Sequence, residues 1–141
     1  MEVRYTPIGH VHSPHDTPED VAHDEVADTT GEIVLEDEYE RGLEGLEEFS
    51  HAVVLAHLDE VDESRLTARP PHVDDVEVGV FATRSPFRPT PIAQTVVEVL
   101  EIDGPRVRVR GLDLVDGTPV LDLKPHVRTV EGDLDVGWLE E

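Results

Sequence analysis

The sequence predicts a mainly β fold: a small antiparallel or mixed β-barrel with one short helix, formed by residues 1–141 as a single domain. Short segments rich in valine and isoleucine recur along the chain, and glycine, proline and aspartate separate them as turn residues do. Only residues 36–48 carry apolar side chains at helical spacing. A chain of this length can also bury most of its unfolded surface in one core.

The N-terminal half is expected to contribute three strands and the helix. Residues 3–11 alternate loosely and predict the first strand, and residues 13–30 are polar and predict a loop. Residues 31–35 and the valine-rich residues 51–58 predict two further strands. The helix at 36–48 is expected to be short because it contains two glycines. Its apolar face consists of Tyr39, Leu43, Leu46 and Phe49.

The C-terminal half is expected to be entirely β, after a polar connection over residues 59–75. Residues 76–82 predict a strand that leads into a proline-rich segment. Asp103-Gly104 predicts a tight hairpin turn between strands at 95–102 and 106–112. Asp116-Gly117 predicts a second one, between strands at 112–115 and 120–123. Trp138 is expected to attach the acidic tail to the body.

Composition indicates a soluble, cytoplasmic protein that is adapted to a solution of unusually high salt. The chain has 33 acidic residues against 11 basic ones, a formal net charge of −22, and Lys124 is its only lysine. Disorder is one explanation of such acidity, but the regular strand patterns favour adaptation to molar salt, as in a halophile. The chain has no cysteine and no apolar run long enough to span a membrane. No membrane or DNA partner is therefore expected.

Positive charge is concentrated in one stretch. Between Arg84 and Val130 seven basic residues face six acidic ones, whereas the rest of the chain is strongly acidic. One interpretation is that an anionic partner approaches this stretch. The other is that its arginines pair with glutamates on neighbouring strands. The sequence leaves both open.

Two segments are unusual for a plain barrel. In the first, GVFATRSPFRPTPI from Gly79, three prolines stiffen a loop that carries Arg84 and Arg88, whose guanidinium groups suit phosphate or carboxylate. In the second, GLDLVDGTPVLDLKPH from Gly111, a hairpin at Asp116-Gly117 would gather Asp113, Asp122 and Lys124 on one face. The alternatives are a rigid turn with charge-balancing arginines, and ordinary turn chemistry beside a surface ion pair.

Other common site patterns are missing. The histidines near the N-terminus lack the spacing of metal ligands, so no metal site is expected. The sequence has no dinucleotide-binding glycine motif, no P-loop and no nucleophile elbow.

Read together, the two segments resemble the signatures of the TrmO (TsaA-like) family. The segments EYERGL from Glu38 and LEEFSH from Leu46, the Ile8-Gly9 and Ser13-Pro14 pairs and the double proline Pro70-Pro71 also resemble the family pattern. The resemblance implies a β-barrel methyltransferase that uses S-adenosylmethionine, works as a homodimer and methylates threonylcarbamoyladenosine beside the tRNA anticodon.

The resemblance also implies positions for the site. The residues expected to contact the cofactor are His57, Leu58, Arg84, Gln94, Asp113, Leu114, Val115 and Asp116. Substrate binding is expected of Arg84, Arg88 and Lys124, because their charges suit a carboxylate or phosphates. Asp122 and His57 are the candidates for the base that removes the acceptor's proton.

The sequence departs from the family pattern in its first loop. Members often have a Pro-Arg-Gln segment there that helps to hold the cofactor, whereas residues 13–30 contain no arginine and no glutamine. Thr90 and Ala93 replace the usual asparagine and glycine, and His126 replaces an aromatic residue. Two alternatives therefore stay open: a barrel that binds S-adenosylmethionine without catalysis, and a methyltransferase with a different nucleoside or small-molecule acceptor.

Overall fold

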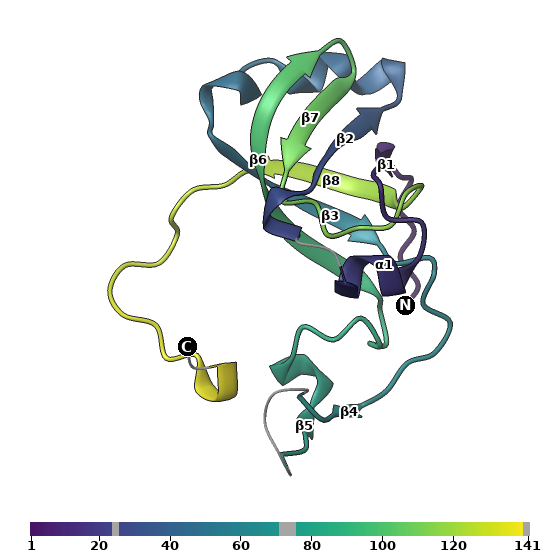
Figure 1. Ribbon diagram of the computed structural model, residues 1–141, viewed down its shortest axis with the longest axis vertical. Coiled ribbons are helices and arrows are strands. Elements are labelled where there is room, and N and C mark those ends of the chain that lie inside the picture. Colours follow the sequence, from purple (N-terminus) through teal and green to yellow (C-terminus); the bar gives the residue numbers. More distant parts are fainter. Residues whose placement is uncertain (24–25, 71–75, 140–141) are drawn as a thin grey trace.

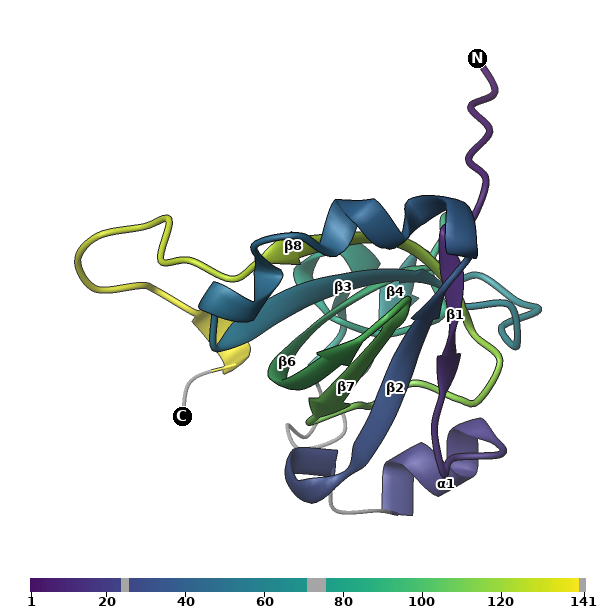
Figure 2. The same cartoon turned by 90° about the horizontal axis from the view of Figure 1, so that it is seen from above.

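The computed structural model describes residues 1–23, 26–70 and 76–139. Its strands close into a barrel in the order β1-β2-β7-β6-β3-β8 (Figures 1 and 2). The barrel strands are β1 (Gly9–His12), β2 (Thr30–Leu35), β3 (His51–His57), β6 (Ile92–Asp103), β7 (Arg106–Arg110) and β8 (Pro119–Pro125). All their pairings are antiparallel, which confirms the predicted fold class. β8 completes the barrel because it pairs with β1 along one side and with β3 along the other.

The core lies inside the barrel and follows from the alternation of side chains along each strand. In β7, Val107 and Val109 are buried while the arginines on either side of them are exposed. β3 shows the same alternation around Val54. The buried cluster consists of Val11, Ile33, Leu35, Leu43, Ala52, Val54, Ala56, Val97, Val107, Val109, Leu112, Leu114 and Val120.

β1 and β2 approach each other unusually closely at Gly9. A Cβ atom at this position would lie 2.2 Å from the carbonyl oxygen of Val34 and 2.8 Å from the Cα of Leu35. Only a residue without a side chain fits there, so this glycine sets the spacing of the two strands.

An arm and a tail lie outside the barrel (Figure 1). In the arm, β4 (Thr67–Ala68) pairs with β5 (Val78–Gly79), and the 3₁₀ turn η4 (Val80–Ala82) follows. The tail leaves the end of β8, loops away from the barrel and ends in the 3₁₀ turn η5 (Gly137–Leu139). There the indole Nε1 of Trp138 donates a hydrogen bond of 2.7 Å to the carbonyl of Ala82, so the tail is attached as expected.

Several predicted elements differ from those observed. The first strand covers residues 9–12, whereas residues 3–11 were expected, and the strand expected at 76–82 is β5 followed by η4. The expected helix consists of two 3₁₀ turns, η2 (Asp37–Leu43) and η3 (Leu46–Glu48), because Gly45 has a φ of 93° between them. The hairpin at residue 103 is present, but its turn residues are Gly104 and Pro105.

The expected N-terminal loop also contains regular structure. It forms the short helix α1 (Pro18–His23) and the 3₁₀ turn η1 (Val26–Asp28). Residues 24–25 of that loop, and residues 71–75 of the polar connection, including Pro71 of the double proline, lie outside the described residues. None of the described helices has the length and apolar character needed to cross a membrane.

Candidate functional site

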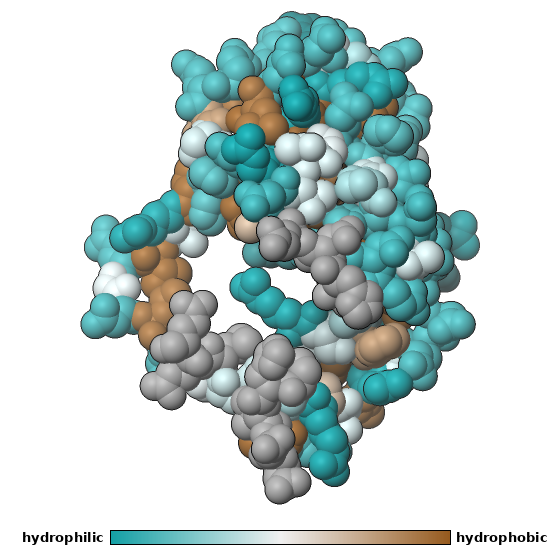
Figure 3. Space-filling view, in the orientation of Figure 1, coloured by the Kyte–Doolittle hydropathy of each residue, from teal (hydrophilic) through white to brown (hydrophobic). Residues whose placement is uncertain are grey.

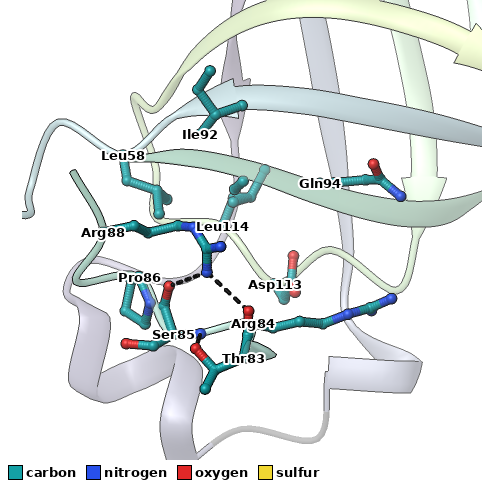
Figure 4. A pocket seen from close by; sticks show the side chains of 11 residues that line it. Leu58, Thr83, Arg84, Ser85, Pro86, Arg88, Ile92, Gln94, Asp113 and Leu114 are labelled. Carbon is teal, nitrogen blue, oxygen red and sulfur yellow. Dashed lines mark hydrogen bonds between the residues drawn. The ribbon is translucent and has the colours of Figure 1, made fainter. Parts of the chain in front are cut away.

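A hollow lies between the open end of the barrel and the proline-rich loop, which we define as residues 83–91. Its volume is about 480 Å³, within the range of small-molecule sites. Three segments far apart in the sequence meet there: the end of β3, the proline-rich loop with the start of β6 that follows it, and the loop before β8 (Figure 4). The lining residues are Leu58, Thr83, Arg84, Ser85, Pro86, Arg88, Ile92, Ala93, Gln94, Asp113 and Leu114.

A second cavity of about 230 Å³ adjoins the first. The two share Leu58, Pro86, Asp113 and Leu114, so together they form one two-lobed site. The second lobe is mostly apolar, with walls from α1, the proline-rich loop and the segment after β3. The residues particular to this lobe are Pro18, Val21, Asp59, Glu60, Val61, Phe87, Val115 and Thr118.

Hydrogen bonds within the proline-rich loop hold its shape. The Thr83 hydroxyl donates to the carbonyl of Val80 at 2.7 Å and accepts from the amide of Ser85 at 3.2 Å. The Ser85 hydroxyl in turn accepts from the amide of Phe87 at 3.2 Å. Since Pro86, Pro89 and Pro91 also fix φ at their positions, the loop is preorganised, and little entropy is lost when it holds a ligand.

The two arginines of this loop differ in their surroundings. Arg88 Nη1 donates to the carbonyls of Thr83 and Ser85, at 2.9 and 3.1 Å (Figure 4). Arg84 is exposed and forms no hydrogen bond or ion pair with the described residues. Its guanidinium is therefore available to an anionic ligand at the larger lobe.

The loop before β8, residues 112–118, is shaped by the N-terminal segment. The Ser13 hydroxyl donates to the carbonyl of Leu114 at 2.7 Å, and His15 Nε2 lies 3.0 Å from the carbonyl of Leu112. The Ser13 amide donates to Asp116 Oδ1 at 2.9 Å, and the Asp116 amide donates to the carbonyl of His15 at 2.7 Å. We call residues 11–15 the N-terminal latch and residues 112–118 the aspartate loop.

These contacts correct the second predicted hairpin. Residues 112–115 form no strand, and the aspartate loop follows the N-terminal latch instead of folding back onto β8. β8 pairs with β1 and β3, so Asp122 faces Leu55 across the ladder and does not share a face with Asp113. The predicted cluster of Asp113, Asp122 and Lys124 is therefore wrong.

Asp113 is the carboxylate that lines both lobes of the site. Desolvation by the surrounding atoms raises its pKa above the usual range for an aspartate, although a hydrogen bond from Thr95 partly offsets that rise. A raised pKa makes a carboxylate a stronger base. The site thus combines a free guanidinium, apolar walls and a basic carboxylate.

Residues 10–132 match the family described as the tRNA-methyltransferase O N-terminal domain, or TrmO_N. The chain belongs to this family. The sequence resemblance is therefore confirmed.

Individual relatives agree with this assignment. The chain is 43% identical to a "Probable S-adenosyl-L-methionine-binding protein" of Archaeoglobus fulgidus, over all of this chain and 39% of that protein. It is 41% identical to a "tRNA (adenine(37)-N6)-methyltransferase" of Escherichia coli, over 75% of this chain and 49% of that protein. The crystal structure of TrmO from Pseudomonas aeruginosa superposes with a TM-score of 0.79 at 30% identity, over 99% of this chain and 64% of that one. The chain thus spans less than two thirds of these relatives.

The TrmO-type cofactor positions fall into two groups. Leu58, Arg84, Gln94, Asp113 and Leu114 line the larger lobe, and Val115 lines the smaller one. His57 and Asp116 line neither lobe. His57 is exposed at the end of β3, and the Asp116 carboxylate is bound to the latch.

The residues expected to bind the substrate or to act as the base also fall into two groups. Arg88 lines the larger lobe, whereas Asp122 and Lys124 lie on β8 and line neither lobe. Lys124 Nζ lies 2.9 Å from Asp122 Oδ2, and this hydrogen bond raises the pKa of the lysine. This is the surface ion pair that the sequence left open as an alternative. No group of three or more metal-ligating side chains occurs among the described residues.

Other arginines of the nearly neutral stretch have glutamate partners on the barrel surface. Arg106 lies 3.2 Å from Glu32, and Arg110 lies 2.9 Å from Glu98. Strand pairing places Glu98 directly opposite Arg110, and Glu32 two residues from Val34, which is the residue opposite Arg106. For these two arginines the structure supports the charge-pairing interpretation.

Sequence reasoning missed part of the lining. Pro18, Val21 and Val61 lie in segments expected to be polar connections, and Phe87 was not singled out within the proline-rich loop. A signal was present in α1, where Val21 follows Pro18 by three positions and shares its helix face. α1 therefore supplies apolar contacts to the smaller lobe from the first loop.

Proposed function

We propose that this chain is an S-adenosylmethionine-dependent methyltransferase that modifies tRNA. The observation that carries the proposal is the convergence of the proline-rich loop and the aspartate loop on one two-lobed site. These two loops also carry the residues by which the sequence resembles the TrmO family. Relatives named for tRNA methylation and for S-adenosylmethionine binding support it further.

The residues present fit this cofactor chemically. Arg84 suits the carboxylate of the methionyl part, and Leu58, Ile92 and Leu114 supply apolar walls for the remainder. Asp113 offers a negative charge to the amino or sulfonium group. When bound, S-adenosylmethionine supplies an electrophilic methyl group.

Asp113 is our candidate for the base that receives the acceptor's proton. The acceptor nitrogen is amide-like and a weak nucleophile, so proton loss has to accompany its attack on the methyl carbon. The bound cofactor would supply the methyl group, and the proton that the acceptor nitrogen loses would pass to the Asp113 carboxylate. The raised pKa of Asp113 and its place on both lobes favour it over Asp122 and His57, which line neither.

The acceptor we propose is the carbamoyl-bearing nitrogen of threonylcarbamoyladenosine, beside the anticodon. This modified base carries a carboxylate of its own, and the positive charge that lines the larger lobe suits an anionic acceptor. We also propose that the protein is a homodimer and that it works in a cytoplasm of high salt. The homodimer is supported by a series of exposed apolar residues along the tail, which are Val127, Val130, Leu134 and Val136 (Figure 3).

The test is methyl transfer from labelled S-adenosylmethionine to tRNA at molar salt, followed by mass spectrometry of the nucleosides. We expect a mass increase of one methyl group on threonylcarbamoyladenosine, and none with Asp113→Asn. tRNA that lacks the threonylcarbamoyl group should accept no methyl. Label on any other nucleoside would refute the proposed acceptor but not the methyltransferase.

A barrel that binds S-adenosylmethionine without turnover is the second candidate. It is favoured by archaeal relatives named only for binding that ligand, and by α1, which offers neither arginine nor glutamine to the smaller lobe. Calorimetry with S-adenosylmethionine, run beside the transfer assay, separates the two. Binding with no methyl transfer to any tRNA would establish the second candidate.

A further inference from the structure

We propose that Arg88 is a positioning residue, which holds the proline-rich loop so that Arg84 faces the carboxylate of the ligand. The inference rests on the proposed function, because it concerns how the same site binds S-adenosylmethionine. It also revises the sequence-based interpretation, in which both arginines bind the substrate directly.

The contacts of Arg88 fall on both sides of Arg84. A single nitrogen, Nη1, donates to the carbonyl of the preceding residue, Thr83, and to that of the following residue, Ser85. The amide of Arg88 also donates to the carbonyl of Pro86 at 2.9 Å, which closes the turn that brings the guanidinium back over the loop. The peptide groups that flank Arg84 are therefore tied to one cation.

A positive charge is well suited to this task. Hydrogen bonds from a charged donor are roughly twice as strong as neutral ones, and both of these bonds are partly buried. The guanidinium carbon also lies 6.0 Å from the centre of the Phe81 ring, at the outer limit of a cation–π contact. Arg88 is thus held by the loop on several sides, and its Nη1 is not available to a ligand.

Arg84 has the opposite character. Its side chain is exposed, lines the larger lobe and lacks a partner among the described residues (Figure 4). A long side chain without partners loses rotamer freedom when it binds. Fixing the backbone on both sides of it reduces that cost, so the contribution of Arg88 should appear only through Arg84.

Lysine is the informative replacement for Arg88. It keeps the charge, but it is shorter and lacks the rigid fork of a guanidinium. Arg69→Lys serves as a matched control, because Arg69 is exposed and lines neither lobe. Thermal unfolding of each variant verifies that the barrel is intact.

The test is a double-mutant cycle read by calorimetric titration with S-adenosylmethionine. We expect Arg88→Lys to weaken binding about tenfold, the equivalent of one charged hydrogen bond, and Arg84→Ala to weaken it at least as much. The Arg84→Ala/Arg88→Lys double variant should bind no more weakly than Arg84→Ala alone. Additive losses would mean that Arg88 contacts the ligand itself, and an unchanged affinity in Arg88→Lys would mean that it has no role. Either result overturns the inference.

A second measurement needs no ligand. Trypsin cleaves after arginine but poorly before proline, so Arg84–Ser85 is its target in this loop, whereas Arg88–Pro89 is resistant. We expect Arg88→Lys to speed cleavage at Arg84 about tenfold relative to cleavage at Arg4, because the loop opens more often. Arg4 is exposed and forms no hydrogen bond with the described residues. Equal rates would overturn the inference. A wild-type chain that binds no S-adenosylmethionine would refute the proposed function and with it the role of Arg88 in binding, whereas failure of Arg88→Lys alone would leave that function standing.

Discussion

Removing the Ser13 hydroxyl should loosen the aspartate loop. This hydroxyl donates to the carbonyl of Leu114 at 2.7 Å and accepts from the amide of His15 at 3.2 Å, in a partly buried position. Ser13→Ala leaves both of these backbone groups without that partner. Loss of a partner from such groups costs about 1–3 kcal/mol, which in a domain of this size lowers the melting temperature by about 3–12 °C.

The assay is urea unfolding at molar salt, with Ser64→Ala as the control. Ser64 is exposed and forms no hydrogen bond with the described residues, so its replacement should change the unfolding free energy by less than about 0.5 kcal/mol. Titration with S-adenosylmethionine should also show weaker binding in Ser13→Ala, because Leu114 lines both lobes. If Ser13→Ala unfolds like Ser64→Ala, the latch does not hold the loop and this reasoning is refuted.

Two further predictions concern stability. Because burial raises the folded-state pKa of Asp113, the stabilisation by its protonated form is complete below the unfolded pKa and is lost as pH rises through the folded pKa. Asp113→Asn should therefore have a higher melting temperature than the wild type near pH 7, and the difference should shrink as pH falls toward about 3. A difference in melting temperature that does not change with pH would contradict the raised pKa. Gly9→Ala should cost about 3 kcal/mol or more, since its Cβ would lie 2.2 Å from the carbonyl oxygen of Val34. Gly42→Ala, with open space around it, is the control, and equal unfolding free energies would contradict the close approach.

Most of the barrel could be predicted from the sequence because its strands have one buried and one exposed face. In β7 the two valines that alternate with arginines are the ones that become buried. β3 is a continuous apolar run, and its buried residues are Ala52, Val54 and Ala56. At residue 103 the turn residues alone were sufficient to predict the hairpin, because the two strands that pair, β6 and β7, follow one another in the sequence. Short-range signals succeed where the pairing is local.

The aspartate loop shows where such signals fail. Asp116-Gly117 has the composition of a hairpin turn, and Gly117 does have a φ of 87°. Yet the backbone groups of this loop bond to the N-terminal latch, a partner about a hundred positions away that no local pattern identifies. Most positions taken from the TrmO resemblance nevertheless line the two lobes, because the resemblance carries information on tertiary contacts that composition and periodicity lack. The exceptions are His57, Asp116, Asp122 and Lys124.

The hydrogen bonds of the N-terminal latch have a consequence for folding during synthesis of the protein. They join residues 97 to 103 positions apart, so the ribosome has to release most of the chain before the aspartate loop meets its partner. Closing so long a loop costs about 4 kcal/mol of chain entropy. A nascent chain therefore acquires its ligand-holding end late, and until then β1 can pair only with β2 and lacks its second neighbour, β8.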